Sequence, residues 1–170
     1  MIKINLKELL NYQKTFDSFV YIKNKVVYKD IKNKLHLAMM AELMELCNEI
    51  RCFNYWSDKK RTSDECVLSE FADVMSFALS EGIEKYNLIE VEDLEIKDCK
   101  KTDNNEQLTD KFLLLIDLYN KIACQKSMLN FISNLFELGY MLGYDIHTIT
   151  NAYHKKCDLV KVMQDKRNVQ

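Results

Sequence analysis

The chain has 170 residues, 48% of them hydrophobic, and a formal net charge of -2. This length suits one domain with a sizeable core, so we expect a single domain over residues 1–170. The small negative charge speaks against a general attraction to nucleic acid, and no apolar run approaches the roughly 20 residues that span a bilayer. We therefore expect a cytoplasmic protein with no nucleic-acid and no membrane partner.

The composition predicts the fold class. Proline is absent and glycine occurs only three times. Because tight turns between strands generally need both residues, we expect an all-α fold, a bundle of about six helices. The six cysteines include no C-x-x-C pair, so they are predicted to be buried, reduced thiols.

Apolar residues recur at threes and fours in six stretches, which predicts six helices in chain order. These helices cover about residues 6–22, 35–55, 63–81, 109–124, 126–142 and 146–163. Residues 26–34 are predicted to be a connector. Residues 90–107, the most polar stretch, are predicted to be an exposed excursion or a mobile loop.

Two helix boundaries carry capping signals. Thr62 and Glu65 have the spacing of a capping box ahead of the third helix. Gly82 is placed near the end of that helix. Gly143 followed by Asp145 predicts the end of one helix and the N-cap of the next.

Acidic residues of the second and third helices lie beside apolar residues rather than opposite them. At about 100° per residue, Glu42, Glu45 and Glu49 fall within an arc of roughly 60° that borders the apolar face. Glu70 and Asp73 repeat the arrangement on the next helix. Removing an ionised carboxylate from water is costly without a partner, so the pattern predicts positive charge between the two helices.

That charge could come from a protein base or from a metal ion. The matching arcs of the two helices carry no Lys, Arg or His, which favours a metal. Oxygen ligands without His or Cys suit Mg²⁺, with Mn²⁺ as the second choice, and Mg²⁺ commonly accompanies substrate phosphates. The alternative is a solvated acidic face, because a single E-x-x-E pair is common on helices that bind nothing.

Two stretches in combination resemble the dimeric all-α dUTP pyrophosphatases, within the all-α NTP pyrophosphatase group. They are "AELMELCNEIRCFNYWS" and "LSEFADVMSFALSEGIE", and weaker similarity extends to "LLNYQKTFD" and "LGYMLGYDIHTITNAYHKK". The resemblance implies a Mg²⁺-dependent enzyme that converts dUTP, and in the family also dUDP, to dUMP. It also implies a homodimer, which would cover helices that carry apolar residues around much of their circumference.

The resemblance also implies roles for individual residues. Four acids would hold the metal: Glu42, Glu45, Glu70 and Asp73. Glu45, or its neighbour Glu49, would orient the attacking water. The candidates for substrate binding are Gln13 through its amide, Asn48, the aromatic residues Phe53 and Trp56, and Lys156 and Gln164 near the C-terminus.

The C-terminal segment "KCDLVKVMQDKRNVQ" departs from the family pattern K-N-x-x-N-x-x-R-Q-x-x-G-Y. Lys156 and Gln164 match, but two Asn, the Arg and the Gly-Tyr pair are replaced, and Asn54 stands where the family usually has Lys. Three alternatives to a dUTP pyrophosphatase therefore stay open. They are a pyrophosphatase for another nucleoside triphosphate, a catalytically weak nucleotide-binding regulatory homologue, and a purely structural bundle.

Overall fold

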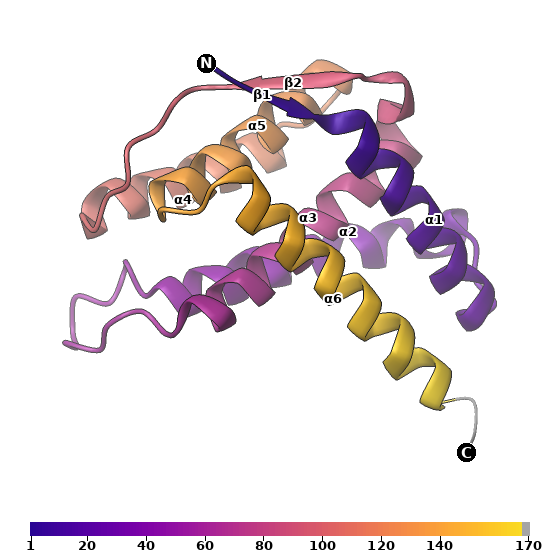
Figure 1. Ribbon diagram of the computed structural model, residues 1–170, viewed down its shortest axis with the longest axis horizontal. Coiled ribbons are helices and arrows are strands. Elements are labelled where there is room, and N and C mark those ends of the chain that lie inside the picture. Colours follow the sequence, from indigo (N-terminus) through magenta and orange to yellow (C-terminus); the bar gives the residue numbers. More distant parts are fainter. Residues whose placement is uncertain (168–170) are drawn as a thin grey trace.

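A computed structural model describes residues 1–167 of the chain (Figure 1). The described part contains six α-helices, so the prediction of an all-α fold is confirmed. The helices are α1 (Leu6–Asn24), α2 (Tyr28–Ile50), α3 (Asp64–Tyr86), α4 (Asn105–Asn120), α5 (Gln125–Met141) and α6 (Ile146–Arg167). A 3-10 turn, η1, covers Leu88–Glu90.

Helix α3 is the centre of the bundle. It packs along α2 as an antiparallel hairpin, and it also contacts α1, α5 and α6. Figure 1 shows α2 and α3 side by side, with α6 crossing the bundle and α4 and α5 paired next to each other. The inner face of α3 is fully buried, with Val67, Phe71, Val74 and Met75 in the core. Helix α3 is therefore held from several sides.

The start and end of α2 differ from the prediction. The helix begins at Tyr28, so most of the expected connector at 26–34 is helical. It ends at Ile50 rather than near residue 55, because Arg51 adopts a left-handed conformation with φ 59° and its N–H caps the Cys47 carbonyl. The segment that follows is therefore a loop that returns the chain to α3.

The boundaries of α3 also differ from the prediction. Its N-cap is Ser63 rather than Thr62, and the Ser63 hydroxyl accepts a hydrogen bond from Cys66 N at 3.3 Å. The helix continues past Gly82 to Tyr86. A Cβ at position 82 would lie 2.7 Å from Leu88 Cδ1, so this glycine permits close packing and does not end the helix.

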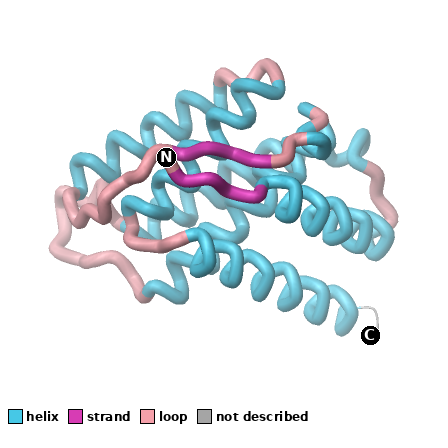
Figure 2. Tube along the Cα trace, turned by 45° about the horizontal axis from the view of Figure 1, so that its top comes forward, coloured by secondary structure: helices cyan, strands magenta, loops and turns pink. Residues whose placement is uncertain are grey.

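A two-stranded sheet was not expected from the sequence. Strand β1 (Ile2–Asn5) pairs in antiparallel register with β2 (Asp93–Ile96), and Figure 2 shows the two strands side by side. Ile4 lies opposite Leu94, and both are buried. The polar stretch at 90–107 thus contains a strand of alternating exposed and buried residues, followed by a loop that leads to α4.

The turn between α5 and α6 agrees with the sequence. Gly143 has φ +92°, a conformation that favours glycine, and Asp145 Oδ1 accepts a hydrogen bond from Thr148 N at 2.8 Å. The predicted helix end and N-cap are confirmed.

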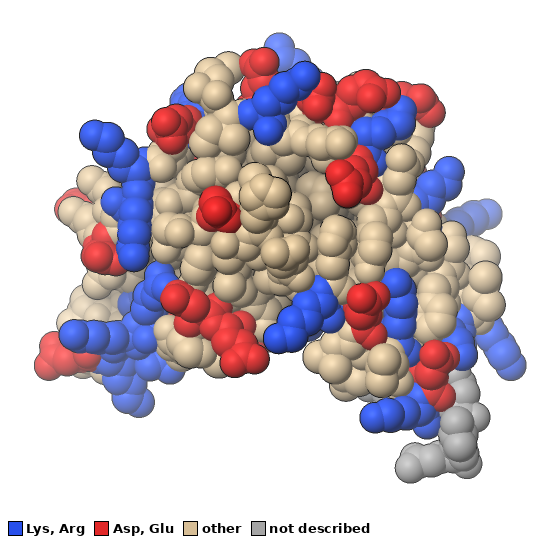
Figure 3. Space-filling view, viewed as in Figure 1, with Lys and Arg blue, Asp and Glu red and all other residues tan. Residues whose placement is uncertain are grey.

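The surface carries both signs of charge. On the face drawn in Figure 3, Lys and Arg alternate with Asp and Glu, and neither sign covers the face alone. None of the helices in the described part of the chain is long and apolar enough to cross a membrane.

Candidate functional site

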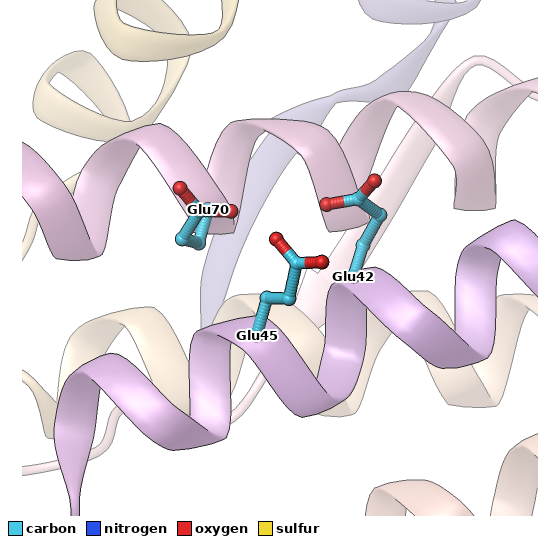
Figure 4. A group of neighbouring side chains, drawn as sticks. All are labelled: Glu42, Glu45 and Glu70. Carbon is cyan, nitrogen blue, oxygen red and sulfur yellow. The ribbon is translucent and has the colours of Figure 1, made fainter.

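Three of the predicted metal ligands converge between α2 and α3. Glu42 and Glu45 lie on α2, Glu70 lies on α3, and carboxylate oxygens of the three lie within 4.8 Å of one another. Figure 4 shows the two α2 side chains directed toward Glu70 across the helix pair. The fully buried Leu43 and Leu46 anchor α2 in the core beside them. We call Glu42, Glu45 and Glu70 the acidic cluster.

The acidic cluster carries more negative charge than its surroundings stabilise. Burial, reinforced by the charges of Asp73, Glu45 and Glu70, raises the pKa of Glu42 to about 7. Burial also raises the pKa of Glu70. These two shifts mean that the folded chain disfavours the ionised forms of Glu42 and Glu70 unless a cation joins them. Oxygen donors alone suit a hard divalent ion, so the residues present fit such a metal.

Asp73 lies beside the acidic cluster but has a partner in the protein. Lys156 of α6 forms an ion pair with the Asp73 carboxylate and donates a hydrogen bond to Ser69 Oγ at 2.7 Å. The two acidic helices supply no base of their own on these arcs, but a third helix supplies one to Asp73. A projection of α2 and α3 alone cannot show a lysine that comes from α6, because Lys156 is 87 residues after Ser69 of α3.

Glu49 is fixed at the end of α2. The Thr62 hydroxyl donates a hydrogen bond to Glu49 Oε2, and Thr62 N donates to the Glu49 carbonyl at 3.0 Å. The Glu49 charge contributes to the raised pKa of Glu70, which places the two carboxyls near each other. Thr62, predicted to cap α3, instead ties the α2–α3 loop to a candidate catalytic residue.

Three of the substrate-binding candidates, one near the end of α2 and two in the loop after it, are exposed or half-buried. Asn48 is exposed on α2, Trp56 is 64% exposed, and Phe53 is half-buried with its ring centroid 5.9 Å from that of Trp56. None of the three lines the pocket that contains Asp73 and Lys156.

That pocket has a volume of about 240 Å³ and opens between α1, α2, α3 and α6. It is lined by Gln13, Phe16, Asp17, Val20, Tyr21, Ile31, Leu35, Asp73, Ser76, Phe77, Ser80, Lys156, Cys157, Val160 and Gln164. We call it the α1 pocket. Asp73 and Lys156 connect its rim to the acidic cluster. Gln164 lies in the lining as well, and its Oε1 accepts a hydrogen bond from Asn24 at 2.9 Å.

Gln13 is buried in the wall of the α1 pocket. Its Nε2 donates to Asp17 Oδ1 at 2.7 Å, and its Oε1 accepts from the Tyr153 hydroxyl at 2.7 Å. Tyr21 and Ser80 were not predicted from the sequence, and Asp17 entered only through the resemblance of "LLNYQKTFD" to the family's Gln and Asp spacing, without an assigned role. Spacing could have indicated Asp17 and Tyr21, because positions 13, 17 and 21 are four apart and share one face of α1.

The fold and the acidic cluster define a class of protein, an all-α bundle that offers carboxylates from an antiparallel helix pair beside a sheltered pocket. A family model described as dUTPase matches residues 5–167. No curated protein sequence matches the chain. The chain belongs to the all-α dUTPase family, which implies dUTP diphosphatase activity. That family generally depends on a divalent metal, and the acidic cluster is the candidate site for it.

The raised pKa of Glu42 predicts an unusual pH dependence of stability. The ordinary pKa of this carboxyl is 4.5 and its pKa in the folded chain is about 7, so the folded state binds more protons than the unfolded state between these values. The free energy of unfolding therefore falls as pH rises through this window. Without metal, we expect a higher melting temperature at about pH 5.5 than at about pH 7.5, measured by circular dichroism in chelator.

Burial also raises the pKa of Asp17 to about 6, so Asp17 contributes a pH dependence of stability in the same direction. The Glu42→Gln variant isolates the contribution of Glu42. The difference in melting temperature between the two pH values should shrink in Glu42→Gln. It should persist in Glu65→Gln, which alters an exposed acid of α3. An equal pH dependence in the wild type and Glu42→Gln would contradict the prediction.

Proposed function

We propose that the protein is a Mg²⁺-dependent dUTP pyrophosphatase that hydrolyses dUTP, and also dUDP, to dUMP. The observation that carries the proposal is the convergence of three carboxylates within 4.8 Å on α2 and α3, next to the α1 pocket. The protein supplies little positive charge to neutralise these three carboxylates. They therefore suit a cation that accompanies phosphates.

Glu42, Glu45 and Glu70 would hold Mg²⁺, and Mn²⁺ fits the same donors. When bound, the ion supplies positive charge for the phosphates and lowers the pKa of a bound water. Lys156 stands at the junction of the α1 pocket and the acidic cluster, where it keeps Asp73 oriented and offers a positive charge to a phosphate.

Glu49 is proposed as the residue that takes up the proton of the attacking water, with Glu45 orienting that water. Thr62 fixes Glu49 through Oε2, which leaves Oε1 to accept the proton. The water oxygen forms a bond to phosphorus while the bond between that phosphorus and the bridging oxygen breaks. The products are dUMP and pyrophosphate from dUTP, and dUMP and inorganic phosphate from dUDP.

The α1 pocket is proposed to receive the base. Phe16, Leu35 and Phe77 give it apolar walls that suit the faces of a pyrimidine ring, and polar groups from α1 and α3 lie deeper in it. Asn48, Phe53 and Trp56 lie outside this pocket, so we give them no part in holding the base.

Substrate comparison tests the proposed function. With Mg²⁺, release of pyrophosphate from dUTP should exceed release from dCTP, dTTP and UTP, and chelation of the metal should abolish it. Binding of a non-hydrolysable dUTP analogue without turnover would instead support the regulatory alternative. Equal rates on all four nucleotides would favour a pyrophosphatase of broader specificity.

We also propose that the protein is a homodimer that uses the outer face of α2. Leu37 is 70% exposed, and Met44 is exposed on the same face. Among the helices described, α4 also exposes Leu113 and Leu114, and its Tyr119 contacts His36 of α2. Two copies that meet through this face would remove these side chains from water.

Light scattering at micromolar concentration is expected to give the mass of a dimer, and Leu37→Asp is expected to give the mass of a monomer. Leu159→Asp changes an exposed leucine of α6 and is the matched control. A wild-type monomer, or a dimer that dissociates only with Leu159→Asp, would contradict the proposal.

A further inference from the structure

Three buried polar atoms in the α1 pocket have no hydrogen-bond partner within the described chain. They are Asp17 Oδ2, the Tyr21 hydroxyl and Ser80 Oγ. Asp17 is 7% exposed and Ser80 is 2% exposed, so bulk water does not satisfy these groups. Because buried polar atoms in folded proteins are nearly always paired, the three atoms mark a position that the polar edge of a ligand completes.

The three groups lie next to one another. Hydrogen bonding with Ser80 lowers the pKa of both Asp17 and Tyr21, so the three side chains are close neighbours, although none of the three atoms has a partner within full hydrogen-bond geometry. Burial dominates both shifts and raises the pKa of Asp17 to about 6 and that of Tyr21 to about 12. Near neutral pH the trio therefore offers one carboxylate acceptor and two hydroxyl donors.

Gln13 is already committed to other partners. Both atoms of its amide are used, one by Asp17 Oδ1 and the other by the Tyr153 hydroxyl. The hydrogen bond from Gln13 holds one carboxylate oxygen of Asp17, which leaves the other, Oδ2, without a partner in the pocket. A ligand would therefore meet a Gln13 side chain that is held in place by one partner at each end of its amide.

We infer that Asp17, Ser80 and Tyr21 bind the polar edge of the pyrimidine, and that Gln13 is a positioning residue that orients Asp17. This inference rests on the proposed function. It makes the trio, rather than the Gln13 amide, the determinant of specificity for the base.

The hydrogen-bonding pattern of uracil supports this assignment. Its polar edge has one donor, N3–H, between two carbonyl acceptors, which complements one carboxylate and two hydroxyls. Cytosine presents an acceptor at N3 and an amino donor at C4, so it would place a lone pair against the carboxylate. A site built from buried polar groups rejects such a mismatch strongly, because those groups lose their partners.

Asp17→Asn is the most direct test. Asn can still accept from Gln13 through its oxygen, while its NH₂ group replaces the acceptor that faces the base. We expect kcat/KM for dUTP to fall about 10- to 100-fold, mainly through KM, and the ratio of dCTP to dUTP hydrolysis to rise at least about tenfold. Ser80→Ala is also expected to lower kcat/KM for dUTP and to raise the ratio of dCTP to dUTP hydrolysis. Ser18→Ala changes an exposed serine of α1 and should match the wild type in both quantities.

Gln13→Met separates positioning from direct contact. If Gln13 acts through Asp17, KM should rise for both nucleotides and the dCTP to dUTP ratio should change less than in Asp17→Asn. Loss of discrimination in Gln13→Met, with discrimination retained in Asp17→Asn and Ser80→Ala, would overturn the inference.

Two controls make the outcome decisive. Calorimetry with Mn²⁺ checks that each variant still folds with an intact acidic cluster. If Asp17→Asn no longer binds Mn²⁺, the variant is misfolded and the test rests on Ser80→Ala. If the wild type neither hydrolyses dUTP nor binds a non-hydrolysable analogue, the proposed function itself fails. If it hydrolyses dUTP while Asp17→Asn and Ser80→Ala keep its specificity, only the present inference fails.

Discussion

Replacement of Glu45 by Gln is expected to lower kcat/KM for dUTP at least about 100-fold, because loss of a group that only orients a metal ligand already costs about 10- to 100-fold. The substitution keeps the shape of the side chain and removes its charge from the acidic cluster. Steady-state release of pyrophosphate measures the loss of activity. Calorimetric titration with Mn²⁺ should show weaker binding in the same variant.

The folded state should tolerate this change. Glu42, Glu45 and Glu70 repel one another, so removing one charge relieves part of the repulsion. We therefore expect the metal-free Glu45→Gln protein to melt no lower than the wild type. Glu65→Gln, an exposed acid on the same helix pair, controls for the loss of charge alone. Wild-type activity in Glu45→Gln would remove Glu45 from the site.

Lys111→Met is expected to lower the free energy of unfolding by about 3–5 kcal/mol, the usual cost of leaving a buried charge without its partner. Lys111 of α4 and Glu137 of α5 are 8% and 7% exposed, and Lys111 Nζ lies 2.7 Å from Glu137 Oε2. Lys111 also donates to Asn134, and Lys97 N donates to Glu137 Oε1. Urea unfolding followed by circular dichroism gives the free energy.

Two variants show that the loss comes from the uncompensated charge. Lys111→Met combined with Glu137→Met should recover most of the stability, because replacing both partners by apolar groups is often neutral. Lys121→Met breaks the exposed pair with Asp117 and should cost less than about 1 kcal/mol. If Lys111→Met costs no more than Lys121→Met, the buried pair does not stabilise the fold as described.

The helical fold and the acidic cluster could be predicted because their signals lie within single helices. Glu42 and Glu45 are three apart on α2, and Glu70 stands on a helix joined to α2 by one loop, so periodicity placed them beside the apolar faces of neighbouring helices, and the family resemblance selected them as metal ligands. The dUTPase family identified from the same stretches is confirmed by the match over residues 5–167.

The features that sequence reasoning missed depend on contacts between distant segments. Strand β1 is only four residues long, too short for a clear alternating pattern, and it is a strand because it pairs with the distant β2. Lys156 reaches Asp73 because α6 crosses α3, which no local pattern encodes. The polar trio of the α1 pocket likewise combines Asp17 and Tyr21 of α1 with Ser80 of α3.

The pairing of β1 with β2 has a consequence for folding during synthesis. The N-terminal strand emerges from the ribosome first, but its partner, Asp93–Ile96, follows only after α1, α2 and α3 have been made. Lys7 at the start of α1 also donates its N–H to the Glu92 carbonyl. Contacts between segments so far apart in the chain form slowly, so a nascent chain that stops before residue 93 leaves β1 and the start of α1 without these backbone partners.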